Sequence, residues 1–211
     1  FTLKTNSLSL AEYNRLSCFH TLSVSKNNYS YFSALHGYRN TNLPGNGDDI
    51  LIGKATANAG TSRDSLNGFA GNDLINGYGN RFNPALDFGT ANPVNQFGLN
   101  QQDILTGGGG RDIFQLADGL GAFYQGDGNQ GYAVITDFGS DDALILSGSA
   151  SDYTLTASLT AKQSPVGLAG RALYLGDPLA GGDLIAILQG SGSAGLQLNP
   201  SDPTRSQIQW L

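Results

Sequence analysis

The sequence predicts an all-β protein, built on a short parallel β-roll with an aromatic N-terminal cap or arm and a C-terminal antiparallel β-cap. The main observation is a recurring pattern in which an aspartate stands two positions before a large apolar residue. Glycines precede several of these aspartates, and short aliphatic runs separated by Gly, Ser, Asp or Pro follow them. The aspartates are Asp49, Asp64, Asp73, Asp103 and Asp112, and the apolar residues are Leu51, Leu66, Ile75, Leu105 and Phe114.

Three segments, starting at Gly45, Gly68 and Gly107, are versions of the nonapeptide G-G-x-G-x-D-x-U-x, where U is a large apolar residue. Glycine permits the positive φ of a tight turn and lets carbonyl oxygens approach an ion, while aspartate supplies a hard anionic oxygen. Each turn would therefore form half of a calcium site. In the three-residue strand that follows, the two-residue period directs the central apolar side chain inward. Stacked turns would bury one apolar stripe.

These segments resemble the RTX (repeats-in-toxin, haemolysin-type) calcium-binding repeats. The resemblance implies a parallel β-roll and Ca²⁺ ions that are shared between the loops of successive turns on one edge. It implies that the glycines and aspartates of the repeats are the metal ligands. These are Gly45, Gly47, Asp49, Gly68, Gly71, Asp73, Gly108, Gly110 and Asp112, with Asp64 and Asp103 as further candidates on the opposite edge.

The spacing of the aspartates divides them between two edges. Asp64 to Asp73 and Asp103 to Asp112 are both nine residues, whereas Asp49 to Asp64 is fifteen and Asp73 to Asp103 is thirty. If each repeat is half a turn, Asp49, Asp73 and Asp112 share one edge, while Asp64 and Asp103 share the other. We expect calcium between the Asp49 and Asp73 loops and between the Asp73 and Asp112 loops.

Two insertions, at about residues 54–61 and 81–100, lead into the aspartates of the second edge. On that edge, Ser62 or Gln101 replaces the glycine two positions before the aspartate. The sequence therefore predicts one edge that binds calcium and an opposite edge that carries the two insertions. The longer insertion, with three phenylalanines among Asn and Pro, either packs its own aromatic rings onto the roll or binds a partner such as a surface glycan.

Residues 118–211 are expected to form the C-terminal β-rich capping region, because their short aliphatic runs between turn residues are typical of antiparallel strands. The segment 135–146 is similar to the "I-x-D-F-x…D-x-I-x-L" stretch that follows RTX repeats, and later runs resemble the ends of repeat proteins from cyanobacteria. The resemblance covers about residues 43–190. Asp137, Asp141 and Asp142 either add one further ion site or only form turns and cap strands.

Residues 1–42 hold seven aromatic residues and both histidines, and their apolar spacing predicts a short helix over residues 9–19. This segment is expected either to cap the roll, residues 43–117, or to pack as an arm on a neighbouring subunit. Cys18 is the single cysteine, so no disulfide can form within the chain. It is either a small buried apolar residue or a reactive or intermolecular thiol.

Composition and motifs exclude several functional classes. The 17 acidic and 11 basic residues give a net charge of -6, the wrong sign for nucleic-acid binding. No run of eighteen apolar residues is present, so no transmembrane helix is expected. Neither a G-x-S-x-G nor an H-E-x-x-H motif occurs, and we expect no enzymatic activity.

Two functional hypotheses stay open, both with Ca²⁺ as the cofactor. The first is a secreted or cell-surface structural protein that self-assembles, as a homo-oligomer or polymer, through the insertion-bearing edge and the N-terminal segment. Its low share of charged residues, 13%, favours close packing of copies in a sheath, layer or filament. The second is a non-catalytic C-terminal module that folds when a larger type I-secreted enzyme or toxin meets extracellular calcium.

Overall fold

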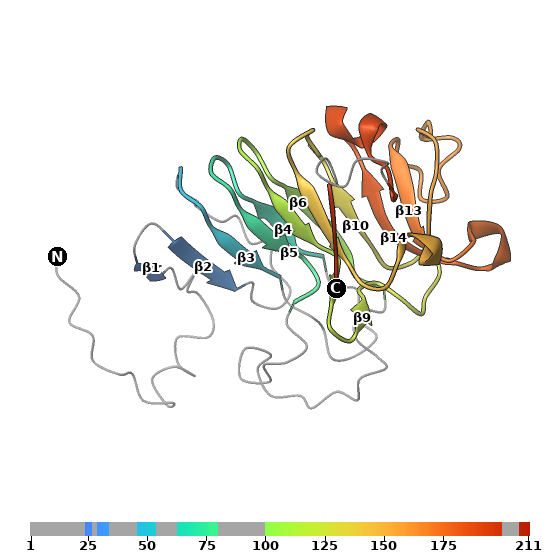
Figure 1. The fold of residues 1–211 in the computed structure, drawn as a ribbon, viewed down its shortest axis with the longest axis horizontal. Coiled ribbons are helices and arrows are strands. Elements are labelled where there is room, and N and C mark those ends of the chain that lie inside the picture. The colour runs from blue at the N-terminus through green and yellow to red at the C-terminus, as the bar shows by residue number, and fades with distance from the viewer. Residues whose placement is uncertain (1–23, 27–28, 34–45, 54–62, 80–99, 200–206) are drawn as a thin grey trace.

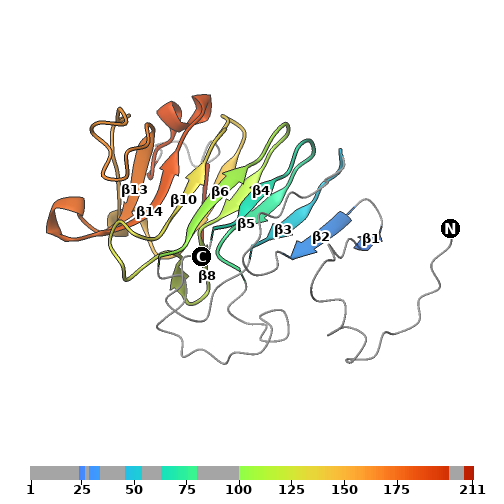
Figure 2. The same cartoon turned by 180° about the vertical axis from the view of Figure 1, so that it is seen from behind.

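The computed structural model describes residues 24–26, 29–33, 46–53, 63–79, 100–199 and 207–211. Within these ranges the chain forms three β-sheets and three short 3₁₀ helices (Figures 1 and 2). The predicted helix over residues 9–19, Cys18, Gly45 and nearly all of both insertions lie outside the described residues. No helix among the described residues is long and apolar enough to cross a membrane.

Two large sheets contain most of the described strands, and neighbouring strands in each order below are hydrogen-bonded. The seven-stranded sheet contains β1 (Val24–Lys26), β2 (Tyr29–Ser33), β3 (Ile50–Ile52), β5 (Leu74–Asn76), β7 (Ile113–Gln115), β11 (Ala143–Leu146) and β15 (Ile208–Trp210). The six-stranded sheet contains β12 (Tyr153–Leu155), β13 (Arg171–Leu175), β14 (Asp183–Leu188), β10 (Tyr132–Ile135), β6 (Gln102–Thr106) and β4 (Ser65–Asn67). A separate hairpin pairs β8 (Ala117–Asp118) with β9 (Gly121–Ala122), and the helices are η1 (Ala150–Asp152), η2 (Pro178–Ala180) and η3 (Ser191–Gly195).

From β4 onward the chain passes back and forth between the two large sheets, so that one strand in each makes one coil; the β8–β9 hairpin and the strands β12 and β13 are additions to this pattern. β4 and β5 form the second coil, β6 and β7 the third, β10 and β11 the fourth, and β14 and β15 the fifth, after a first coil represented by β3. Successive coils pair in parallel within each sheet. A parallel pair needs a crossover between its strands, and the crossover here is the strand in the opposite sheet.

The apolar residue of each repeat lies between the two sheets, as the strand period predicts. Leu51, Ile75 and Phe114 are in register across β3, β5 and β7, and each is 0% exposed. Leu66 and Leu105 are in register across β4 and β6 and equally buried. Burying each such side chain contributes roughly 1.5–3 kcal/mol, so these two rows hold the coils together.

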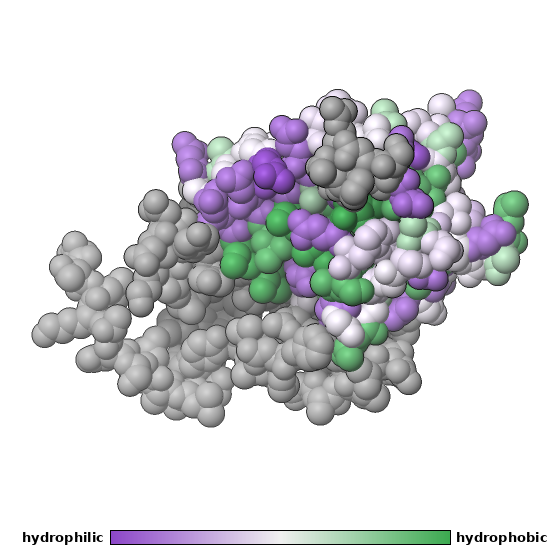
Figure 3. All heavy atoms as spheres, in the orientation of Figure 1, coloured by the Kyte–Doolittle hydropathy of each residue, from purple (hydrophilic) through white to green (hydrophobic). Residues whose placement is uncertain are grey.

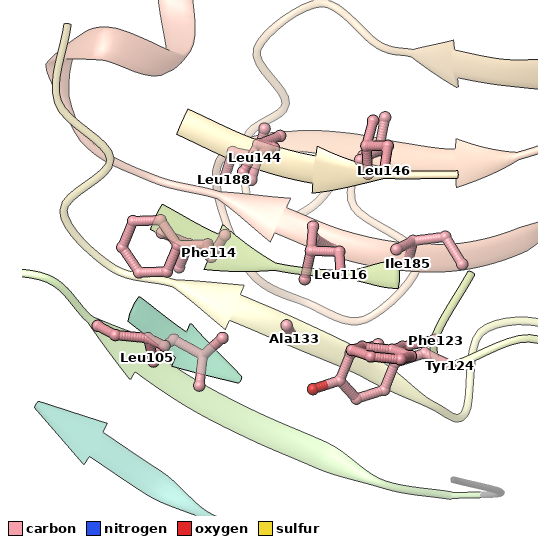
Figure 4. Packing of buried hydrophobic residues seen from close by; sticks show 14 of the residues in the cluster. Leu105, Phe114, Leu116, Phe123, Tyr124, Ala133, Leu144, Leu146, Ile185 and Leu188 are labelled. Carbon is pink, nitrogen blue, oxygen red and sulfur yellow. The ribbon is translucent and has the colours of Figure 1, made fainter. Parts of the chain in front are cut away.

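The same two rows continue through the later coils. Leu144 follows Phe114 in one sheet and Ile135 follows Leu105 in the other, and both are fully buried. Figure 4 shows Leu105, Phe114 and Leu144 among the side chains that fill the space between the strands. A second, smaller cluster of Tyr132, Val134, Ala172, Tyr174, Leu184 and Ile187 packs against the partly buried Leu159, Val166 and Leu168.

The predicted fold class, an all-β roll closed by an antiparallel C-terminal cap, is wrong. The structure is a mixed-sheet fold of three sheets with mostly parallel strands and almost no helix among the described residues. Parallel pairing does not end at residue 117, because β10 pairs in parallel with β6 and β14, and β11 with β7 and β15. Among the later strands, only β12 and β13 add antiparallel pairs to the edge of the six-stranded sheet.

The physical reason for this error lies in the loops. Short aliphatic runs between turn residues look the same in the sequence whether the strands pair in parallel or antiparallel, and pairing is decided by where the intervening chain travels. At the N-terminal side, β2 also pairs in parallel with β3 and so extends the seven-stranded sheet.

Candidate metal site

One edge of the stack carries an aspartate directly before each of four strands of the seven-stranded sheet, β3, β5, β7 and β11. We call Asp49, Asp73, Asp112 and Asp142 the aspartate column. The Asp49 N–H donates to Asp73 Oδ1 at 2.8 Å, the Asp73 N–H to Asp112 Oδ1 at 2.9 Å, and the Asp112 N–H to Asp142 Oδ1 at 2.9 Å. These loops lie side by side along the upper edge in Figure 1, coloured from cyan to yellow.

The glycine two positions before the aspartate is required by the close stacking of the loops. Gly71 and Gly110 both have φ +136°, which L-residues with a side chain rarely adopt. A methyl group at Gly71 would lie 2.3 Å from the Gly47 carbonyl oxygen, and one at Gly110 would lie 1.8 Å from the Gly71 carbonyl oxygen. The glycine pattern therefore has a packing cause that acts with or without an ion.

The second oxygen of two column carboxylates is left without a hydrogen-bond partner. Asp73 Oδ2 and Asp112 Oδ2 are buried, and both residues are 1% exposed. A methyl group at Gly68 would lie 2.0 Å from Asp73 Oδ2 and 2.6 Å from the Gly107 carbonyl oxygen. A methyl group at Gly107 would lie 2.2 Å from Asp112 Oδ2. Each of these oxygens thus faces the glycine at the start of its own loop.

Burial raises the pKa of Asp73 to about 6 and that of Asp112 to about 6, because desolvation disfavours the charged form. The hydrogen bond from the Asp49 N–H lowers the pKa of Asp73, and that from the Asp73 N–H lowers the pKa of Asp112, while neighbouring carboxylates raise both pKa values further. An unpaired buried carboxylate is costly unless it is protonated or held by a cation. Both groups therefore have a physical reason to bind a positive ion at neutral pH.

The atoms that could act as metal ligands at these positions are hard oxygens, which suit Ca²⁺ better than a metal that prefers sulfur or nitrogen ligands. Carboxylate Oδ2 of Asp73 and the Gly107 carbonyl oxygen both lie against the α-carbon of Gly68, so oxygens of the second and third loops come close together there. No group of three or more His, Cys, Asp or Glu side chains that could hold a metal occurs among the described residues. A cation in the column would therefore depend on backbone carbonyl oxygens as well as carboxylates.

The residues before Asp49, Asp73 and Asp112 form a second, outer ladder. The Asn72 N–H donates to Asp48 Oδ1 at 2.7 Å, and the Arg111 N–H donates to Asn72 Oδ1 at 2.9 Å. Here the side chain of the earlier loop accepts from the later loop, the reverse of the aspartate column. Hydrophilic residues accordingly follow much of the upper left edge of the face in Figure 3, where these loops lie.

The opposite edge brings Asp64 and Asp103 together, as predicted, but protein groups occupy the Asp103 carboxylate. The Asp64 N–H donates to Asp103 Oδ1 at 2.8 Å. The Tyr124 hydroxyl at 2.7 Å and Gln101 Nε2 at 3.0 Å both donate to Asp103 Oδ2. Burial, followed by the charge of Asp64, raises the pKa of Asp103 well above its usual range. Three donors thus already satisfy this carboxylate.

Tyr124 is a site residue that the repeat pattern does not reveal. It has φ +56°, is 1% exposed, and packs edge to face against Tyr78, whose ring stacks on Phe123 at 4.5 Å. Figure 4 shows Phe123 and Tyr124 side by side in the core. Both follow the β8–β9 hairpin, which has no counterpart in the described parts of the other coils, so no spacing rule could identify them.

The fourth coil supplies the remaining predicted acidic residues. Asp137 Oδ1 accepts from the Gly107 N–H at 3.0 Å, and its Oδ2 accepts from the Gly108 N–H at 2.8 Å. Asp142 Oδ2 accepts from the Gly139 N–H at 2.7 Å, whereas Asp141 is exposed. Asp142 stands two residues before Leu144, the same spacing as in the repeats, and this signal could have placed it in the column.

Comparison of the chain with protein-family models and with curated protein sequences found no match.

Proposed function

We propose that this chain is a secreted or cell-surface calcium-binding structural protein of the RTX type. The observation that carries the proposal is the pair of buried carboxylate oxygens, Asp73 Oδ2 and Asp112 Oδ2, that lack a hydrogen-bond partner in successive loops of one column. A divalent cation is the simplest partner for such a pair, because it neutralises the buried charge and accepts ligation by oxygen.

The residues that would hold calcium are those of the column loops. Asp73 and Asp112 would contribute Oδ2, and Gly107 would contribute its carbonyl oxygen next to Asp73 Oδ2. Bound calcium would supply positive charge between loops whose aspartates otherwise repel one another. Since the loops also stack through their glycines, calcium would stabilise a stack that the chain already favours.

Self-assembly is the second part of the proposal. The chain has a net charge of -6 and only 13% charged residues, so bound divalent cations would leave little repulsion between copies. Within the described residues, β4 and β15 each pair on one side only, and such edge strands can accept a strand from another chain. The insertions and the N-terminal segment remain the predicted contacts, and of these only β1, β2 and Asn100 lie among the described residues.

Isothermal titration with Ca²⁺, with circular dichroism and light scattering on the same samples, tests this function. We expect dissociation constants of about 0.1–1 mM, typical of extracellular modules, a gain in β-structure, and scattering that rises with calcium. Asp73→Asn should remove one binding event, while Asp141→Asn, which removes the same charge from an exposed position, should leave binding unchanged.

The outcomes separate the hypotheses. Calcium-dependent folding without any rise in scattering would favour the alternative, a folding and secretion module of a larger protein. A chain that binds no calcium and is equally folded in chelator would refute the calcium function altogether.

A further inference from the structure

We infer that two copies of this chain associate through the β4 edges of their six-stranded sheets, antiparallel about a two-fold axis at Leu66, so that the two sheets join into one. The inference rests on the self-assembly part of the proposed function and gives it a specific contact surface. This surface is an edge strand, distinct from the insertions and the N-terminal segment.

The outer edge of β4 carries backbone groups that no described strand pairs with. β4 is the last strand of the six-stranded sheet and pairs with β6 alone among the described strands (Figure 2). Towards β6, the Asp64 carbonyl oxygen accepts and the Gly68 N–H donates a backbone hydrogen bond. Because the backbone groups of successive residues alternate between the two sides of a strand, those of Ser65 and Asn67 point away from β6. They can therefore pair with a strand of another chain.

The sequence of β4 does not protect this open edge. Proline, lysine and β-bulges commonly prevent edge strands from pairing with another chain. Ser65, Leu66 and Asn67 include no proline and no charged residue, and they pair with β6 in unbroken register. Ser65 is exposed, and its register partner Ile104 is 47% exposed although it is a large apolar residue. The surface beside the edge is therefore accessible and partly apolar.

Phe69, two residues beyond β4, is an independent sign of a partner. It has φ +70° and is 48% exposed, and a bulky side chain rarely adopts such a backbone conformation. The parallel bridge between Ala70 and Gly109 aligns Phe69 with Gly108, so the next coil uses a glycine at this position. The second coil thus keeps a strained backbone at a residue whose aromatic ring is half exposed, which favours a contact outside the chain.

Antiparallel pairing of two β4 edges gives a register that fits these residues. With Leu66 on the two-fold axis, Ser65 of one copy lies opposite Asn67 of the other, and each such pair exchanges two backbone hydrogen bonds. The same register places Arg63 of one copy opposite Phe69 of the other. Arg63 is exposed, so its guanidinium is free to lie over the aromatic ring in a cation–π contact. Both contacts occur twice, as a two-fold axis requires.

Charge also favours the antiparallel arrangement of the two copies. The chain has a net charge of -6, but residues 65–67 are uncharged and Asp64, which precedes them, is only 5% exposed. Antiparallel pairing places the loop that contains Asp73 next to the opposite edge of the other copy. The two aspartate columns therefore lie at opposite ends of the contact and do not repel each other directly.

The short contact predicts a weak dimer. β4 has three residues, and interfaces that bury less than about 1,200 Å² are typical of transient complexes. Dimers should therefore appear only as the protein concentration rises. Measurements should extend to about 1 mM chain, the dissociation constant of a very weak complex.

Analytical ultracentrifugation in calcium tests this contact. Ser65→Pro removes an outward N–H without touching the bonds to β6, so it should weaken dimerisation at least about tenfold. Ser65→Thr is the matched control, because it keeps the N–H. Phe69→Ser should weaken dimerisation as well. Its control is Leu120→Ser, which removes a side chain of similar exposure, 51%, from the β8–β9 hairpin and should leave dimerisation unchanged.

Disulfide trapping covers the case in which Ser65→Pro alters folding, which circular dichroism would detect. In chains that also carry Cys18→Ser, Ser65→Cys and Asn67→Cys should cross-link when mixed, because Cα atoms directly opposite in such a pair are about 5.5 Å apart. Neither chain alone should cross-link. Equivalent residues of the two copies are offset by two positions along the contact, which puts their Cα atoms beyond the reach of a disulfide, about 7 Å.

The outcomes separate this contact from self-assembly as such. If the wild-type chain dimerises but Ser65→Pro folds and behaves like Ser65→Thr, or if the mixed cysteine chains do not cross-link, the assignment to β4 is wrong while self-assembly stands. If the wild-type chain stays monomeric up to about 1 mM in calcium, self-assembly itself fails. Titration calorimetry of the same samples tests the calcium function separately.

Discussion

The Asp73 N–H donates a 2.9 Å hydrogen bond to Asp112 Oδ1 although the two residues are 39 positions apart in the chain. The bond fixes one carboxylate oxygen of Asp112 and directs the other toward Gly107, where it has no partner. The same carboxylate thus joins two loops with one oxygen and leaves the other without a hydrogen-bond partner. Because the hydrogen bond joins protein groups only, the aspartate column can be part of the fold before any ion binds.

The buried carboxylates predict that calcium suppresses most of the pH dependence of stability. The pKa of Asp73 and of Asp112 is about 6 in the folded chain, above the usual value of 3.8, so the folded state holds protons that the unfolded state has lost. In chelator, the free energy of unfolding should therefore fall as the pH rises from about 4 to about 6 and then level off. Calcium should remove most of this decline, because it stabilises the ionised carboxylates.

Urea denaturation at a series of pH values, with and without calcium, measures this effect. Part of the decline should persist in calcium, because burial also raises the pKa of Asp103, which lies on the opposite edge. Calcium affinity should rise with pH up to about 6 as protons stop competing for Asp73 and Asp112. An identical pH profile in chelator and in calcium would contradict the prediction.

The packing of the column loops predicts a large cost for a side chain at Gly110. Gly110→Ala would place a methyl group 1.8 Å from the Gly71 carbonyl oxygen at a φ of +136°. We expect a loss of about 3 kcal/mol or more in the free energy of unfolding, in chelator as well as in calcium. Gly119→Ala is the control, because nothing lies within 4 Å of the added methyl group. Comparable unfolding midpoints for the two variants would show that the loops do not stack this closely.

Sequence reasoning identified the parts of the fold that have a fixed period. The nine-residue spacing placed Asp49, Asp73 and Asp112 in one column and the five apolar residues in the core, because both depend on local turn and strand geometry. It failed where the loops vary in length. Leu144 and Ile135 continue the same core rows, yet loops of different length and a hairpin separate them from the repeats and hide the parallel pairing.

The repeat spacing also predicted only part of the candidate metal site. Asp142 belongs to the column, but Ser140 occupies the position that carries glycine in the repeats, so the motif does not extend to it. The preceding hairpin brings Tyr124 to Asp103. This contact depends on the tertiary structure, and the spacing of residues in the sequence does not indicate it.

The hydroxyl of Tyr124 is expected to stabilise the opposite edge without any ion. Tyr124→Phe removes one of the three donors to the buried Asp103 side chain, and leaving a buried acceptor without its partner costs about 1–3 kcal/mol. Calcium affinity should not change, since Asp73 and Asp112 lie on the other edge. Tyr174→Phe serves as the control, because the structure gives the Tyr174 hydroxyl no hydrogen bond to a described residue. A loss of calcium binding in Tyr124→Phe would instead place an ion at Asp103.

Asp112→Asn should separate the structural role of the column from its role as a ligand. Asparagine keeps an Oδ1 acceptor for the Asp73 N–H but removes the buried charge. In chelator at pH 7 the variant should therefore be at least as stable as the wild-type chain, because the wild-type chain must bury an ionised carboxylate there or take up a proton. In calcium the order should reverse, because the wild-type chain gains the free energy of ligand binding, about 2.7 kcal/mol at one hundred times the dissociation constant. Thermal unfolding of both chains in chelator and in calcium measures the two effects. A variant that is less stable than the wild-type chain by the same amount in both conditions would mean that the carboxylate charge serves the fold and not an ion.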